Sequence, residues 1–217
     1  MRISRQHACY LMSLLFFCCL IQSEKEWIIH LKPQISSTDS ILQQYQSQME
    51  SVWEELRCFP VPESTGDKNA QVTFKNTWMA ERNYRGKRKH EGIDLMATPD
   101  KSGYFPILSM TDGEVEQVGW LEQGGWRIGI RSVNGNYYYY AHLHSYVSNW
   151  KRGDSVKAGE ILGYMGDTGY GPEGTTGKFP VHLHVGIYIP GAEQKDTAVN
   201  PYWMLRYLET EKRSCVF

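Results

Sequence analysis

Short runs rich in β-branched and aromatic residues alternate with glycine-containing turns between residues 71 and 189, and this pattern limits the possible folds most strongly. The runs include "QVTF", "GIDLMA", "FPILSM", "RIGIRSV", "YYYYAHL" and "VHLHVGIYI". Segments of about five residues that are bounded by turn residues predict the strands of an antiparallel sheet. We therefore expect a mainly β domain with many strands.

Two helices are expected to flank the strands. Between Thr38 and Leu56 the apolar residues recur at helical spacing, and Ser, Thr and Asp cluster at the start of the segment as capping residues. The prolines of "CFPVPES" end this helix. We expect it to pack on the domain, because a free stalk would not need Trp53. A second, short helix is expected over "NPYWMLRYLETE", residues 200–211.

The first 23 residues have the features of a targeting segment. Arg2 and Arg5 precede the apolar stretch Ala8–Ser23, which is nearer in length to the hydrophobic region of a signal peptide than to a membrane span of about 20 residues. We expect a cleaved signal peptide over residues 1–23, and an uncleaved membrane anchor is the alternative. Either one predicts an extracytoplasmic protein, secreted or associated with the cell envelope.

Only two of the five cysteines, Cys58 and Cys215, lie outside that leader. Exported proteins form disulfides, so one bond between these two thiols could tie the ends of the domain together. Two free thiols are the alternative.

The formal net charge of the chain is −1. The absence of a basic excess does not favour nucleic acid as a partner. We expect a monomer that could meet a membrane only through an uncleaved N-terminal anchor.

Five of the seven histidines fall in three clusters: "KHEGIDL", "YAHLHS" and "VHLHV". In a strand, residues two apart point to the same face, so His182 and His184 can face one site. Imidazoles in such an arrangement bind zinc, and a carboxylate such as Asp94 would complete a three-ligand set that leaves one position open to water. The alternative is a histidine pair that is merely buried in a core or exposed at a surface.

Two other motifs in the chain fail when their spacing is checked. "HEGID" begins like the helical His-Glu-X-X-His zinc motif, but Asp94 takes the position of the second histidine and Gly92 disfavours a helix. "GPEGTTGKF" is similar to a phosphate-binding loop, but Pro172 replaces the first glycine and Phe179 replaces the Ser or Thr that would bind magnesium. We expect that loop to form the rim of a groove.

Taken in order, "HEGID", "YAHL", "GDSVKAGEILGYMGDTG" and "HLHVGI" resemble the M23 family of zinc metallopeptidases, the lysostaphin/LytM-like peptidoglycan endopeptidases. Each motif alone is weak, but all four in this order are specific. The resemblance implies an antiparallel β-sheet or β-sandwich peptidase core of the lysostaphin/LytM type over residues 59–211. A helical or linker segment at residues 24–58 would precede it, and a short tail at residues 212–217 would follow.

The resemblance also implies the roles of five residues in one metal site. It places the ligands of a single Zn²⁺ at His90, Asp94 and His184, and it places two catalytic histidines that are not ligands at His142 and His182. The implied substrate is a peptide bond in bacterial peptidoglycan, attacked by a water that the zinc activates. One departure from the family pattern is His144, where Ser is usual, and we expect it at the surface.

Two questions stay open at the level of sequence. Tyr138 and Tyr140 share the face of His142 in a regular strand, so they either line a substrate groove or pack within the sheet. The domain could also be a non-catalytic module that binds wall peptides or activates another hydrolase, or a peptidase for other substrates. Inactive members of the family typically lose a ligand, whereas all five positions are filled here.

Overall fold

The computed structural model describes residues 40–191 and 195–217. The expected targeting segment lies outside the described residues. The chain divides into two compact units, Met1–Ser47 and Gln48–Phe217. Of the first unit, residues 40–47 are described and are helical. Among the described residues, no helix combines the length and the apolar content that a membrane crossing requires.

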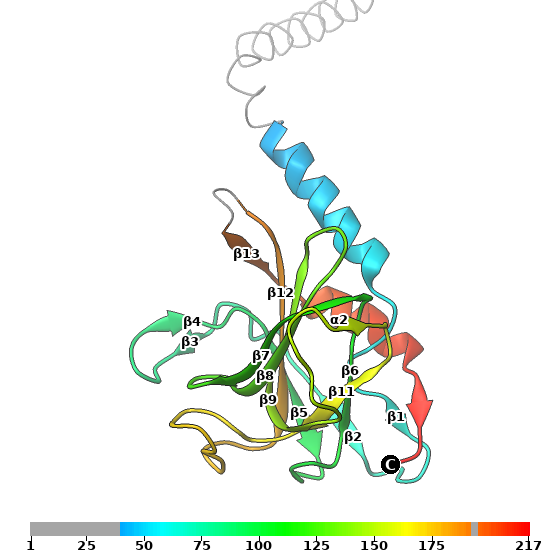
Figure 1. Cartoon of the computed structure of the whole chain (residues 1–217), viewed down its shortest axis with the longest axis vertical. Coiled ribbons are helices and arrows are strands. Elements are labelled where there is room, and N and C mark those ends of the chain that lie inside the picture. Colours follow the sequence, from blue (N-terminus) through cyan, green and yellow to red (C-terminus); the bar gives the residue numbers. More distant parts are fainter. Residues whose placement is uncertain (1–39, 192–194) are drawn as a thin grey trace, which may run out of the picture. The chain divides into compact units, whose positions relative to one another are not determined.

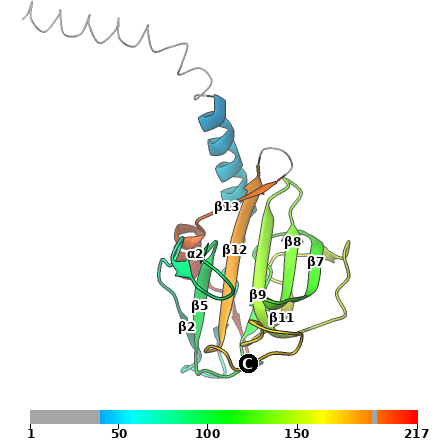
Figure 2. The ribbon, with the colours of Figure 1, turned by 90° about the vertical axis from the view of Figure 1, so that its left-hand side faces the viewer.

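The second unit is a mainly β domain, as predicted, built on one large antiparallel sheet (Figures 1 and 2). The order of its main path is β10 (Ser155–Val156), β7 (Gly113–Leu121), β8 (Gly125–Arg131), β9 (Tyr137–Tyr146), β12 (His182–Pro190), β5 (Ile93–Thr98) and β2 (Gln71–Thr73). Three further strands join it: β13 (Asp196–Val199) pairs with β12, and β11 (Ile161–Met165) pairs with both β9 and β6 (Pro106–Leu108).

Two small sheets and two helical segments complete the unit. The first small sheet is the antiparallel hairpin of β3 (Glu81–Arg82) and β4 (Arg88–Lys89), and the second pairs β1 (Glu63–Ser64) in parallel with β14 (Ser214–Cys215). Residues 48–55 are helical, and the C-terminal helix α2 (Tyr202–Leu208) continues into the 3₁₀ turn η2 (Glu209–Glu211). The antiparallel sheet and both helices agree with the prediction.

One face of the large sheet forms the core, because alternate residues of each strand point to it. Leu183, Val185 and Ile187 of β12 are fully buried there beside Ile128 and Ile130 of β8. Their neighbours in β12, His182 and His184, point to the opposite face. The apolar alternation of "VHLHVGI" therefore determines where the histidines stand.

Both helical segments pack on this core. Val52 and Leu205 are fully buried in the same apolar cluster. Trp53, which motivated the prediction of packing, is 41% exposed and meets the ring of Tyr207 edge-on at 5.7 Å. The helix thus docks through Val52, and Trp53 lies at the margin of the contact.

The two ends of the unit are joined by backbone pairing rather than by a covalent bond. In the parallel pair of β1 and β14, Ser64 lies opposite Cys215. Cys58 and Cys215 are both free: the buried Cys58 thiol donates to the Ser109 carbonyl at 3.2 Å, and Cys215 is half-buried. The structure therefore contains the two free thiols and lacks the Cys58–Cys215 disulfide. Burial raises the pKa of the Cys58 thiol and keeps it protonated.

Strand β9 carries an irregularity at His142 that determines the geometry of the site. Ala141 pairs with His184 of β12, whereas Leu143, two residues later, pairs with Met165 of β11. The register against β8 shifts at the same place, and His142 has a φ of 64°. A bulge inserts one extra residue and reverses the alternation of side chains. His142 is thereby placed on the face of His184, while Leu143 stays in the core.

Candidate active site

Three side chains from neighbouring segments converge at the middle of the sheet. His90 follows β4, Asp94 lies in β5, and His184 lies in β12 directly opposite Asp94 in the strand register. The Nε2 atom of His90 lies 3.1 Å from Oδ1 of Asp94 and 2.9 Å from Nδ1 of His184. The third side of this triangle, from His184 Nδ1 to Asp94 Oδ1, is 3.0 Å. Three potential ligand atoms thus face one common point.

Neighbouring groups fix how each ligand is presented. Nδ1 of His90 lies 3.0 Å from the carbonyl of Thr77. Nη2 of Arg82 lies 3.0 Å from the same nitrogen and can only donate, so the two neighbours favour opposite tautomers. In the tautomer with the proton on Nδ1, bonded to Thr77, Nε2 keeps its lone pair for a metal. Arg82 donates to the outer oxygen of Asp94 at 2.5 Å, which leaves Oδ1 for the site. Gly92 makes room for the ring of His184, since a Cβ there would lie 2.5 Å from its Cε1 atom.

The protonation states suit a cation. Burial raises the pKa of Asp94, but hydrogen bonds with His184 and His90 outweigh it and hold that pKa well below its usual range. Burial lowers the pKa of His184, which keeps the imidazole neutral with a lone pair to offer. Metal ligands must be deprotonated in this way. Two imidazole nitrogens and one carboxylate oxygen fit the donor preference of zinc.

Two further histidines, His142 and His182, lie beside the triangle with their ring centroids 4.6 Å apart. Nδ1 of His142 lies 2.7 Å from the carbonyl of Thr168, and Nδ1 of His182 lies 2.8 Å from that of Pro180. Both Nδ1 atoms must therefore donate, which leaves Nε2 of each ring as a proton acceptor. Burial lowers the pKa of His142 well below its usual value and keeps the ring neutral. Nε2 of His182 lies 3.9 Å from Oδ1 of Asp94.

A groove of about 700 Å³ opens over these five residues. Aromatic side chains line much of it: Tyr137, Tyr139, Tyr170, Phe179 and Tyr188. Burial raises the pKa of Tyr137 and of Tyr188 to about 12, so both phenols remain hydrogen-bond donors at neutral pH. The groove can hold an extended peptide against the triangle of ligands.

Of the two alternatives for Tyr138 and Tyr140, the structure shows packing within the sheet and not lining of the groove. Both are fully buried in the core, where Tyr138 donates to Glu55 at 2.9 Å and Tyr140 accepts from the Met110 amide at 2.8 Å. Tyr137 and Tyr139 take the groove positions instead. A regular strand would put His142 on the face of Tyr138 and Tyr140, and the bulge at His142 moves it to the face of Tyr139.

The assigned faces predict that removing the hydroxyl destabilises the protein at Tyr140 but not at Tyr139. Tyr140→Phe leaves the buried Met110 amide unpaired, and we expect the free energy of unfolding to fall by about 1–3 kcal/mol. Tyr139→Phe removes a hydroxyl that bonds to no described residue, and we expect a change within about 0.5 kcal/mol. Urea unfolding curves of both variants measure the difference. A larger loss in Tyr139→Phe than in Tyr140→Phe would contradict the assigned faces.

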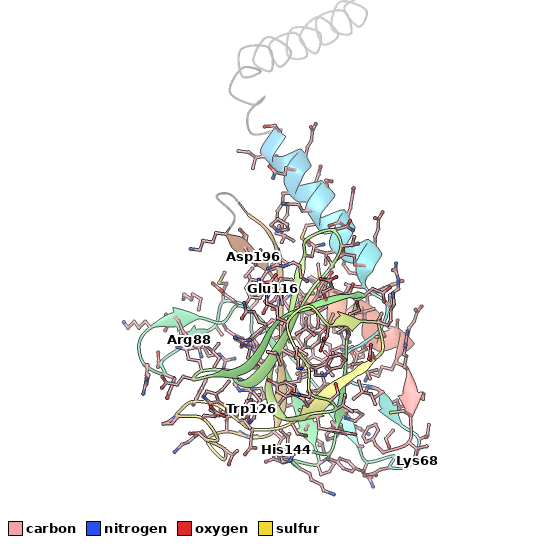
Figure 3. The ribbon with its side chains drawn as sticks, viewed as in Figure 1. Lys68, Arg88, Glu116, Trp126, His144 and Asp196 are labelled. Carbon is pink, nitrogen blue, oxygen red and sulfur yellow. The ribbon has the colours of Figure 1, made fainter. Side chains whose placement is uncertain are left out.

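His144 stands apart from the site, as predicted. Its side chain is exposed at the far end of β9, away from the hairpin of β3 and β4 (Figure 3). Its Nδ1 lies 3.1 Å from the hydroxyl of Ser102, which in turn donates to Asp167 at 3.1 Å. The serine stands between the histidine and the carboxylate, so this cluster is not a nucleophilic triad.

Sequence reasoning missed the residues that orient the ligands and the neighbouring histidine His142. Arg82, Thr77 and Thr168 lie in irregular or very short segments, and two of the three act through a backbone carbonyl. Every residue has a backbone carbonyl, so the residue type does not reveal which carbonyl makes such a contact. Only Arg82 could have been suspected from the sequence. It is a cation eight residues before His90, and the predicted site contains the carboxylate of Asp94, which a cation could bind.

Comparison with known proteins gives a consistent result. Peptidase family M23 matches residues 88–201. An L-Ala–D-Glu endopeptidase from Bacillus subtilis (strain 168) is 40% identical over 151 residues, which are 70% of this chain and 43% of the relative. Glycyl-glycine endopeptidase ALE-1 of Staphylococcus capitis is 36% identical over 83 residues, 37% of this chain and 21% of the relative. The chain thus spans less than half the length of these relatives.

A solved structure from Ruminococcus gnavus ATCC 29149, provisionally called a glycyl-glycine endopeptidase lytM, is 48% identical to this chain. It superposes with a TM-score of 0.71 and covers 84% of this chain and 75% of its own.

Proposed function

The chain belongs to peptidase family M23, and from this membership we propose that it is a zinc-dependent endopeptidase that hydrolyses peptide bonds in bacterial cell-wall peptidoglycan. One observation carries the proposal: the ligand atoms of His90, Asp94 and His184 form a triangle with sides of 2.9–3.1 Å, beside two histidines whose Nδ1 atoms face backbone carbonyls and whose Nε2 atoms can accept a proton. A metal site alone would not need the second pair. Action on the cell wall also implies an extracytoplasmic location.

We assign one zinc ion to His90 Nε2, Asp94 Oδ1 and His184 Nδ1. Zinc bound there supplies Lewis acidity, which polarises a peptide carbonyl and lowers the pKa of water toward about 7. Arg82 holds the Asp94 carboxylate in place. The carbonyl of Thr77 holds the ring of His90, as partners of metal-bound histidines commonly do.

His142 and His182 supply the proton transfers. The Nδ1 proton of each ring is committed to a backbone carbonyl, so neither Nε2 can donate until it has accepted a proton. In our proposal one ring takes the proton of the attacking water on Nε2 and later delivers it to the leaving amine. A ring protonated at Nε2 can also donate to the oxygen that becomes negative in the tetrahedral intermediate.

The length of the similarity suggests which bond is cut. The L-Ala–D-Glu endopeptidase matches this chain over 151 residues, whereas glycyl-glycine endopeptidase ALE-1 matches it over 83. We therefore propose the L-Ala–D-Glu linkage of the wall peptide as the substrate bond. The glycyl-glycine linkage is the second candidate, because the Ruminococcus gnavus structure provisionally carries that activity in its name.

Removal of the metal tests this function. We expect the purified protein to release new amino groups from cell walls. A chelator should abolish the release and added zinc should restore it, because the chelator competes with the three ligands for reversibly bound zinc. The measurement is labelling of free amines over time, and heat-inactivated protein is the control. A protein that binds zinc but releases no amines from any wall preparation would be a non-catalytic binding module.

A further inference from the structure

The cationic side chains on the groove wall differ in whether a carboxylate lies beside them. Four cations line the groove, Arg82, Arg88, Lys89 and Arg127. Arg82 pairs with Asp94, and the amine of Lys89 lies 3.5 Å from a carboxylate oxygen of Glu81. Within the described ranges, Arg88 and Arg127 form no ion pair. The groove therefore presents two positive charges that are not paired with any acidic side chain of the described residues.

Arg127 also has a buried donor without a partner. Its Nη1 atom is buried and bonds to no described residue, and its Nη2 atom reaches only Oε1 of Gln117, at 3.3 Å. A buried polar group without a partner is rare and destabilises the fold, so it calls for an explanation. In a groove that receives a substrate, a ligand that bonds to Arg127 is such an explanation.

A second arginine on the same strand shows how β8 pairs a guanidinium when its role is structural. Arg131 lies four residues after Arg127 on the same face, and it bonds to Glu116 at 2.5 and 2.7 Å and to Asp196 at 2.8 and 3.0 Å. These two carboxylates come from β7 and β13 and lie close together (Figure 3). Arg131 is thus paired with two carboxylates, whereas no acidic side chain in the described part of the domain pairs with Arg127.

Arg127 stands at the level of the metal ligands along the sheet. In the register it lies across from the bulge at Ala141 and His142, and Ala141 lies opposite His184. Adjacent strands are about 4.8 Å apart, so the backbones of Arg127 and His184 are about 10 Å apart. An extended peptide covers about 3.4 Å per residue, so that distance corresponds to about three residues of substrate. The backbones are thus about three substrate residues apart, and the long Arg127 side chain, which lines the same groove, shortens the span to the bond that is cut.

We propose that Arg127 binds a free carboxylate of the peptide substrate and thereby selects for glutamate beside the scissile bond. This inference rests on the proposed function. Glutamate has two carboxyl groups. When one forms the peptide bond to the following residue, the other remains as a free carboxylate. A guanidinium binds a carboxylate through two parallel hydrogen bonds that an amide cannot reproduce. A chain of glycines offers no such group.

Arg88 also has a buried donor without a described partner, its Nε atom, but it is the less suitable of the two unpaired cations. It lies on the β3–β4 hairpin rather than in the large sheet (Figure 3), and its Nη2 donates to the hydroxyl of Tyr170 at 3.1 Å. Arg127 projects from the middle of the large sheet, whose strands hold it in place. A strand paired on both sides within a large sheet is held more firmly than a strand of a two-stranded hairpin.

The test uses two synthetic wall peptides that are identical except at the glutamate, which has either a free carboxylate or a carboxamide. We expect the zinc-loaded wild-type protein to favour the carboxylate in kcat/KM by about tenfold or more. Arg127→Gln should lose this preference, chiefly by losing activity on the carboxylate peptide. Arg88→Gln removes the same charge from the same groove and should keep the preference.

Binding separates this inference from the proposed function. Titration calorimetry with chelator-treated protein, which cannot cut, should give tighter binding of the carboxylate peptide to the wild type and equal binding of both peptides to Arg127→Gln. Cleavage of neither peptide, with the binding preference intact, would overturn the peptidase activity and support the role of Arg127. Equal wild-type binding of both peptides, or a preference that survives in Arg127→Gln, would overturn the role of Arg127.

Discussion

The His184→Ala protein is expected to lose its zinc. Its Nδ1 atom is one corner of the ligand triangle, 2.9 Å from His90 and 3.0 Å from Asp94. Mutation of a group that merely orients a ligand already costs about 10- to 100-fold in metal affinity, so the loss of a ligand should cost more than about 100-fold. Competition with a coloured zinc chelator measures the affinity, and amine release from cell walls should fall to background in parallel.

The chain offers a matched control for this variant. His144 belongs to the same Leu-flanked histidine pattern, in "YAHLHS", but it is exposed and contacts Ser102 rather than the site. We expect His144→Ala to bind zinc as the wild type does. Near-ultraviolet circular dichroism should show that both variants are folded. Undiminished zinc affinity in folded His184→Ala would show that this residue is not a ligand.

The His142→Ala protein is expected to keep its zinc and lose its activity. Its ring is buried beside the ligand triangle without being part of it, and Nε2 is free to accept a proton. General acid–base catalysis contributes about 10²- to 10⁴-fold to a rate, and we expect kcat to fall by that range. KM should change less than kcat, because proton transfer occurs in the transition state.

Zinc content and rate must be measured on the same sample of His142→Ala. Metal analysis gives the zinc per chain, and cleavage of a defined wall peptide gives kcat. His144→Ala again serves as the control and should retain both. Loss of zinc from His142→Ala would mean that this histidine is a ligand, which would overturn the separation of His90, Asp94 and His184 from the proton-transfer pair.

Much of the fold followed from local patterns in the sequence. The alternation in "VHLHVGI" predicted that His182 and His184 share a face, and His184 does lie opposite Asp94 across the strands. The helical spacing from Thr38 to Leu56 predicted the helix found at residues 40–55 of the described chain. Such patterns are readable because they depend on period and not on contacts between distant segments.

The bulge at His142 could not be predicted. A bulge has no reliable composition, and His142 adopts a φ of 64° without being glycine. Two backbone hydrogen bonds hold His142 in place. Its N–H donates to the carbonyl of Gly124, and its carbonyl accepts from the N–H of Gly166. These contacts lie 18 and 24 residues away in the sequence, and they decide which tyrosines face the groove.

The unpaired state of Arg127 was also beyond sequence reasoning. Arg127 and Arg131 look equivalent in "WRIGIRS", since both are arginines on the same face of one strand. Only the tertiary structure shows that Glu116 and Asp196 converge on Arg131. The state of Cys58 and Cys215 could not be predicted either, because the sequence shows two cysteines but not the distance between them in the fold.

Mass spectrometry of defined wall peptides tests the central claim most directly. Incubation with the zinc-loaded protein should convert one peptide into two fragments whose summed mass exceeds the parent by one water. The new amino terminus should be glutamate, and the fragments should be absent when His184→Ala replaces the wild type. Intact peptides after incubation with zinc-loaded, folded protein would contradict the account, and so would fragments that form equally well without metal.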